Sequence, residues 1–349
     1  MSWPDRTWYA QVQLTIVLTI IVIMTDDSRM TKRALRRALA LSAGLTLLAA
    51  CGTDEGAGAG ADGDSGDGDS GGDALSIQAA FYPLQWITEQ IGGDAVSVEG
   101  MTPPGAEPHD LELTPQDVAA MGEADLVVYL SDFQPAVDDA VDQQASDTSF
   151  DAAEHTDLEL TYTPIEEGEE EADEAGATDP HFWLDPMHLA DVADALAERL
   201  GELDADNADT FTEHAAELRN SLEELDTEFT DGLATCENTD LVTSHNAFGY
   251  LAQAYGLTQV GITGLTPEEE PSAADLAEMA DFVEENDVRT IYYETLVSPA
   301  IADAVAAETG AQTALLDPLE GLTDESQGSD YLEVMRSNLD NLRAGQPCD

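Results

Sequence analysis

Basic residues are scarce in this chain. Its 349 residues include 11 lysines and arginines against 73 aspartates and glutamates, which gives a formal net charge of −62 at pH 7. A surface of this sign repels nucleic acids and other anions and attracts cations, so nucleic-acid binding is excluded. Self-repulsion at this charge destabilises a compact fold unless salt screens it. We therefore predict a halophilic or salt-tolerant source.

The N-terminal region has the composition of a targeting segment. A basic stretch at residues 32–37 precedes an apolar run of 13 residues at 38–50, shorter than the roughly 20 that a membrane-spanning helix needs. This order is typical of a secretory signal, and a single membrane helix is the alternative. Cys51 directly follows Leu-Ala-Ala, which resembles the lipobox of bacterial-type lipoproteins. The resemblance implies that Cys51 becomes the lipid-modified first residue.

A second apolar stretch lies upstream of this signal, at residues 8–24. A signal sequence rarely follows another hydrophobic segment. Our hypothesis is that translation starts at Met30 or Met24 rather than at Met1. The alternative is a genuine additional membrane anchor.

Cysteine is also rare, with three residues in the chain. With Cys51 modified by lipid, Cys236 and Cys348 remain, and an even pair in an exported chain predicts a disulfide. Two free thiols or an additional pair of metal ligands are the alternatives. Without residues 1–50 the chain retains 70 acidic and 5 basic residues, so its net charge becomes −65.

Short apolar runs alternate with amphipathic stretches from residue 74 onward, which predicts α/β architecture with parallel sheets. The predicted strands are Leu75–Ala80, Ala95–Glu99, Asp125–Leu130 and Leu158–Tyr162 in the first half, and Asp240–Ser244, Gln259–Ile262, Thr290–Glu294 and Gln312–Leu316 in the second. Between the halves, apolar residues recur at helical spacing over Ala208–Ala234. A helix of about 27 residues is ~40 Å long, which is enough to connect two small lobes.

These patterns divide the chain into five segments. The predicted boundaries are 1–50 for the extension and signal peptide, 51–73 for a flexible acidic Gly/Ser/Asp tether, 74–206 for the first lobe, 207–235 for the connecting helix and 236–349 for the second lobe. Residues 165–178 are rich in glutamate and predict an acidic loop. The predicted fold is two lobes, each a parallel sheet flanked by helices, joined by one long rigid helix.

Three histidines and an aspartate have the features of one metal site. His109, His181, His245 and Asp317 each lie in a short segment next to proline, glycine or a small residue. His245 and Asp317 directly follow predicted strands, and ligands bind beyond the carboxyl ends of parallel strands. Three imidazoles and a carboxylate suit a borderline cation such as zinc. We expect the site in a cleft between the lobes.

Several short motifs, taken together and in order, resemble the metal-specific solute-binding lipoproteins of ABC transporters, with the zinc-uptake branch closest. They are Phe81–Leu84, Pro103–Asp117, Asp179–Pro186, Ser244–Leu257, Tyr292–Glu294 and Leu315–Leu319. The resemblance implies that His109 and His181 come from the first lobe and His245 and Asp317 from the second. Manganese-binding relatives usually have glutamate where this chain has His245, which favours zinc. Glu107 and water are the alternatives to Asp317 as fourth ligand.

The resemblance also implies a function. The chain is expected to be a monomer, anchored by lipid to the outer face of the cytoplasmic membrane, that captures Zn²⁺ and passes it to the permease subunits of an ABC transporter. Manganese or iron is the alternative cargo. A zinc hydrolase is a competing class, but the sequence has no His-Glu-x-x-His or similar compact catalytic motif. A cell-surface adhesin is the third class.

Overall fold

The structure is a computed structural model that describes residues 74–162, 176–267 and 270–348. These residues belong to one compact unit, Asp69–Asp349. The predicted signal peptide, Cys51, the tether and most of the acidic loop lie outside the described residues. Among the described helices, none combines the length and the apolar character needed to cross a bilayer.

The first lobe is built on a parallel four-stranded sheet in the order β2-β1-β3-β4. Its strands are β1 (Leu75–Ala79), β2 (Val96–Gly100), β3 (Leu126–Tyr129) and β4 (Ser149–Asp151), and its helices are α3 (Tyr82–Gly92), α4 (Pro115–Glu123) and α5 (Pro135–Ala140), which continues as a π-helical turn at Val141–Ala145. The central strands β1 and β3 are mostly apolar and are largely buried on both faces, as parallel crossovers require.

The predicted strand Leu158–Tyr162 is wrong. The fourth strand is Ser149–Asp151, which pairs with β3, whereas Thr161 forms only an isolated bridge with Thr178. This bridge closes the base of the segment that contains the acidic loop, and Tyr162 N donates to Ala177 O there. The residues at 158–162 therefore pair with residues 177–178 and take no part in the four-stranded sheet.

The second lobe repeats this arrangement, with a parallel sheet in the order β6-β5-β7-β8. Its strands are β5 (Asp240–Thr243), β6 (Thr258–Gly261), β7 (Thr290–Tyr293) and β8 (Gln312–Leu315), and its helices are α8 (Gly249–Tyr255), α9 (Ala273–Glu285), α10 (Ala300–Thr309) and α11 (Tyr331–Gly345). Ser272 caps α9 in a reciprocal capping box with Asp275, as the Ser-x-x-Asp sequence predicts.

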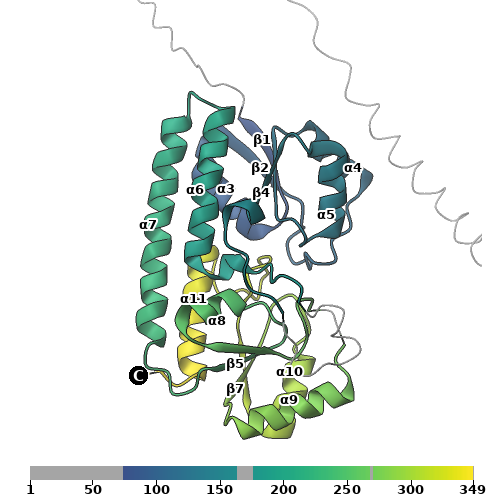
Figure 1. The fold of residues 1–349 in the computed structure, drawn as a ribbon, viewed down its shortest axis with the longest axis vertical. Coiled ribbons are helices and arrows are strands. Elements are labelled where there is room, and N and C mark those ends of the chain that lie inside the picture. Colours follow the sequence, from purple (N-terminus) through teal and green to yellow (C-terminus); the bar gives the residue numbers. More distant parts are fainter. Residues whose placement is uncertain (1–73, 163–175, 268–269, 349) are drawn as a thin grey trace, which may run out of the picture. The chain divides into compact units, whose positions relative to one another are not determined.

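Two long antiparallel helices, α6 (Pro186–Leu203) and α7 (Ala208–Leu233), run beside the lobes (Figure 1). The predicted connecting helix is thus confirmed as α7. Its apolar stripe, which includes Phe211, Leu222 and Phe229, is buried against α3 and α6 at one end and α11 at the other. The helix joins residues of both lobes in a shared hydrophobic core.

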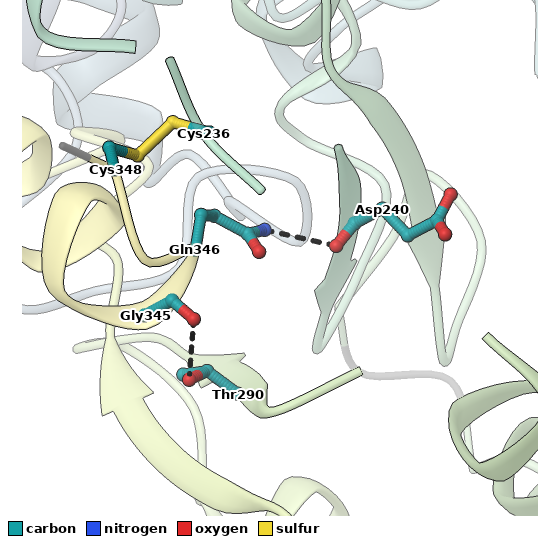
Figure 2. The surroundings of a disulfide bond; sticks show 6 residues. All are labelled: Cys236, Asp240, Thr290, Gly345, Gln346 and Cys348. Carbon is teal, nitrogen blue, oxygen red and sulfur yellow. Dashed lines mark hydrogen bonds between the residues drawn. A yellow bond between two sulfur atoms is a disulfide. The ribbon is translucent and has the colours of Figure 1, made fainter. Parts of the chain in front are cut away.

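The predicted disulfide between Cys236 and Cys348 is present and joins residues 112 positions apart (Figure 2). The surrounding bonds attach the C-terminus to the beginning of the second sheet. Gln346 Nε2 donates to Asp240 O over 2.9 Å, and Thr290 Oγ1 donates to Gly345 O over 3.2 Å. The disulfide therefore lies at the amino ends of β5 and β7, away from the carboxyl ends where ligands bind in such sheets.

Candidate metal centre

Three of the four predicted ligands come together with a glutamate that the sequence did not indicate. His109, His181, His245 and Glu320 each direct one donor atom to a common point, and these atoms lie within 4.8 Å of one another. His245 follows β5 and Glu320 follows β8, so both lie beyond carboxyl ends of the second sheet. His109 lies in the segment between β2 and α4, and His181 immediately precedes the 3₁₀ turn Phe182–Leu184.

The distances from Glu320 to the three imidazoles match those around a tetrahedral ion. Glu320 Oε1 lies 3.5 Å from His109 Nε2 and 3.4 Å from both His181 Nε2 and His245 Nε2. Around a tetrahedral zinc ion with bonds of about 2.0–2.1 Å, neighbouring ligand atoms are about 3.3–3.4 Å apart. The four side chains are buried, and their inward-facing atoms have no hydrogen-bond partner. Because unpaired buried polar atoms are strongly unfavourable, this arrangement is suited to a bound cation.

Carboxylates on the outer side of the imidazoles fix two of the rings. Asp179 Oδ1 lies 2.7 Å from His181 Nδ1, and Glu294 Oε2 lies 2.7 Å from His245 Nδ1. A proton held on Nδ1 leaves the Nε2 lone pair free for a metal, which is the usual arrangement around metal-binding histidines. The His109 ring instead packs edge-on against Phe133, with ring centroids 4.6 Å apart.

Burial and charge act in opposite directions on these groups. Burial by itself lowers the pKa of His245, but Glu294 and Glu320 outweigh it and hold the pKa well above its usual value. Burial is also opposed at His181, where the nearby carboxylates of Asp179 and Glu320 leave the pKa raised. At His109 burial prevails and the pKa is lowered. Burial would raise the pKa of Glu320, but its contacts with the three imidazoles hold it well below the usual value.

Asp317, the predicted fourth ligand, lies outside this group, and Glu320 stands in its place. Its Oδ1 accepts from Leu319 N over 2.9 Å and its Oδ2 accepts from Ser326 Oγ over 2.7 Å. Its backbone exchanges two hydrogen bonds with the Asn338 side chain. Both carboxylate oxygens are thus used to shape the loop that presents Glu320.

The loop after β8 turns sharply between the two acids. Leu319 has φ 58°, a left-handed conformation that is unusual for a non-glycine residue. Trp183 Nε1 donates to Pro318 O over 2.8 Å, and Tyr331 Oη donates to Trp183 O over 2.6 Å. These bonds hold the loop next to the His181 segment and direct Glu320 inward.

Glu107, the alternative fourth ligand, lies beside the group without joining it. Its Oε1 accepts from His109 N over 3.1 Å, and its Oε2 is buried without a partner. Burial and the charge of Glu320 raise the pKa of Glu107 to about 9. Glu320, and not Glu107, has an oxygen within the donor group, so Glu320 is the better candidate.

The three remaining histidines lie outside the metal group. His155 stacks on Phe150, with ring centroids 4.5 Å apart. His188 Nδ1 lies 2.7 Å from Thr156 Oγ1, and His214 Nδ1 lies 2.9 Å from Ile91 O. Each therefore makes a local contact outside the metal group.

Comparisons with known proteins agree with the fold and with the chemistry of this centre. The family model described as "ZnuA: Zinc-uptake complex component A periplasmic" matches residues 77–345. The high-affinity zinc uptake system protein ZnuA of Bacillus subtilis (strain 168) is 36% identical over 318 residues, which cover 87% of this chain and 95% of that protein.

Two streptococcal proteins are similar in sequence and structure. The zinc-binding lipoprotein AdcA of Streptococcus pneumoniae is 36% identical over 77% of this chain and 55% of its own length. Its Zn(II)-bound ZnuA-like domain superposes with a TM-score of 0.65 at 34% identity, over 78% of this chain and 99% of the domain. The laminin-binding protein Lmb of Streptococcus agalactiae, described as having adhesin and metal-transporting activity, gives a TM-score of 0.69 at 35% identity, over 78% and 100%.

Proposed function

Because this chain belongs to the family of the zinc-uptake complex component A, we propose that it is an extracytoplasmic solute-binding protein that captures Zn²⁺ and delivers it to an ABC permease. The observation that carries this proposal is the group of three buried imidazoles and one carboxylate, whose donor atoms lie within 4.8 Å of one another. Family membership supports the role in metal uptake, and the set of donor residues supports zinc as the metal that is carried.

The proposed ligands are His109, His181, His245 and Glu320. Three imidazoles and one carboxylate oxygen favour zinc over manganese, which prefers oxygen donors and higher coordination. A catalytic zinc site has three protein ligands and keeps one position open for water, whereas here four protein donors gather in one group. The arrangement therefore favours carriage of the ion over hydrolysis.

The remaining parts of the proposal concern location and assembly. We propose that Cys51 carries the lipid anchor, that residues 51–73 act as the tether, and that the monomer works at the outer face of the cytoplasmic membrane. The lobes are assigned to residues 74–206 and 236–349, with the connecting helix at 207–235. The strongly negative surface raises the local concentration of cations near the site.

Competitive metal titration tests the proposal. We expect the purified chain, in high salt, to bind one zinc ion tightly and to keep it against excess manganese. The variant His245→Ala should lose this site because it removes one of the four donors. Manganese displacing zinc, or equal binding by the variant, would contradict the assignment of the cargo or of the site.

The affinity for zinc should depend on pH through the histidines. The raised pKa values of His181 and His245 mean that both imidazoles remain protonated above the ordinary value of about 6.5 in the zinc-free protein. Zinc must displace these protons, so its affinity should rise with pH from 6 to 8. Calorimetry in buffers of different ionisation enthalpy should detect about one or more protons released per zinc at pH 7. A pH-independent affinity with no proton release would contradict this prediction.

Adhesion is a second candidate function, favoured by the similarity to the laminin-binding Lmb. The test is binding to immobilised laminin by the wild-type chain and by His245→Ala. Binding by both would support an adhesive surface separate from the metal centre. Absence of binding in high and low salt would remove this candidate.

A further inference from the structure

The carboxylate of Asp179 is held firmly from the side of the first lobe. Its Oδ1 accepts from His181 N over 2.9 Å and lies 2.7 Å from His181 Nδ1. Its backbone N donates to Leu160 O over 2.9 Å. Asp179 is only 5% exposed. Rotation of this carboxylate would therefore break its contact with the His181 ring.

Its other oxygen, Oδ2, lies directly against Gly249, the first residue of α8 in the second lobe. A Cβ added at Gly249 would overlap Asp179 Oδ2 and would also lie 3.4 Å from Leu160 Cδ1. Gly249 does not belong to the glycines with positive φ. Its backbone would thus accept alanine, and the close approach of the carboxylate is what requires glycine.

We propose that Gly249 is a positioning residue of the zinc site and acts through Asp179. The missing side chain leaves the space in which the carboxylate can hold the Nδ1 proton of His181, so that Nε2 points at the metal. Gly249, in the second lobe, thereby determines the orientation of His181, a ligand from the first lobe. This inference rests on the proposed zinc function.

The variant Gly249→Ala tests the proposal, with Gly122→Ala as the matched control. A Cβ at Gly122 in α4 would make its nearest contact at 3.5 Å, an ordinary van der Waals distance. We expect Gly249→Ala to weaken zinc binding by about 10–100-fold, the range for loss of an outer-shell partner of a metal ligand. Gly122→Ala should bind zinc like the wild type.

A double-mutant cycle separates positioning from general damage. Asp179→Ala alone should also weaken zinc binding about 10–100-fold. If Gly249 acts through Asp179, the double variant Asp179→Ala/Gly249→Ala should bind no more weakly than Asp179→Ala, because the overlap has been removed. Losses that multiply in the double variant would overturn the proposal.

A spectroscopic signature reports on the same contact. The proton on His181 Nδ1, held by Asp179, should give a downfield proton NMR signal in the zinc-loaded wild type. It should shift or disappear in both Gly249→Ala and Asp179→Ala but not in Gly122→Ala. A signal that is unchanged in Gly249→Ala would overturn the proposal.

The possible results test the role of Gly249 separately from the proposed zinc function. A wild-type chain that binds no zinc would contradict the proposed function. A wild type that binds zinc, together with Gly249→Ala binding equally well, would overturn only the role of Gly249. Should Gly249→Ala fail to fold, the double variant lacks the overlap and is expected to fold. Failure of the double variant as well would place the role of Gly249 outside the contact with Asp179.

Discussion

Replacing Glu320 by glutamine is expected to weaken zinc binding by more than about 100-fold. This loss should exceed the roughly 10–100-fold effect of mutating an outer-shell partner, because Glu320 supplies a donor atom and the only carboxylate of the group. Glutamine has nearly the same shape, so the effect reports on charge and donor strength. Competition against a chromophoric chelator of known zinc affinity would measure it.

Asp317→Asn is the matched control, since it makes the same chemical change three residues earlier. The Asp317 carboxylate accepts from Leu319 N and Ser326 Oγ instead of facing the three imidazoles. We expect zinc affinity to change less than about tenfold, while the free energy of unfolding falls by about 1–3 kcal/mol because buried hydrogen bonds are weakened. A larger loss of zinc affinity in Asp317→Asn than in Glu320→Gln would reverse our assignment of the fourth ligand.

The sequence could not reveal which of the two acids, Asp317 or Glu320, is the fourth ligand. Both follow β8, and Asp317 comes first, two residues after the end of the strand. Which carboxylate faces the histidines depends on the left-handed backbone of Leu319 and on the bonds from Trp183 and Asn338. These partners are far away in the sequence, so local pattern offers no signal. The only sequence signal for Glu320 as a candidate ligand is that it lies three residues after Asp317 in the same loop.

The three histidines were predictable because their local surroundings are distinctive. A proline directly precedes both His109 and His181, and His245 comes two residues after the end of β5, a largely buried strand. The supporting carboxylates were only partly predictable. Asp179 is one of several acids near the histidine segments, and Glu294 directly follows β7, where a carboxylate can also support the backbone. Their contacts with His181 and His245 depend on how separate strands are placed side by side.

The fold followed largely from apolar patterning, with one clear failure. Ser149–Asp151 is a three-residue strand with one buried apolar side chain, Phe150, so it has no period that could be recognised. The segment 158–162 has a better alternating pattern but pairs with residues across the acidic loop. Tertiary contacts determine which strands pair. In a short edge strand such as β4, these contacts outweigh the local strand propensity of the sequence.

Removing the disulfide with Cys236→Ala/Cys348→Ala should produce the largest loss of stability. The bond joins residues 112 positions apart, and closing a loop of this size restricts the unfolded chain strongly. The chain-entropy account gives about 4.7 kcal/mol for a loop of 100 residues, and measured losses are typically about 2–5 kcal/mol. We therefore expect the free energy of unfolding to fall by about 2–5 kcal/mol, measured by urea unfolding at constant high salt.

Zinc affinity should respond differently, because the disulfide and the metal centre lie at opposite ends of β5. Cys236 precedes the strand, whereas His245 follows it. The folded double variant should therefore bind zinc within about tenfold of the wild type. The reduced wild-type chain is the matched control, since it retains both sulfur atoms and loses only the covalent bond. If the reduced chain kept its stability while the double variant lost it, side-chain packing and not loop closure would be the source of the effect.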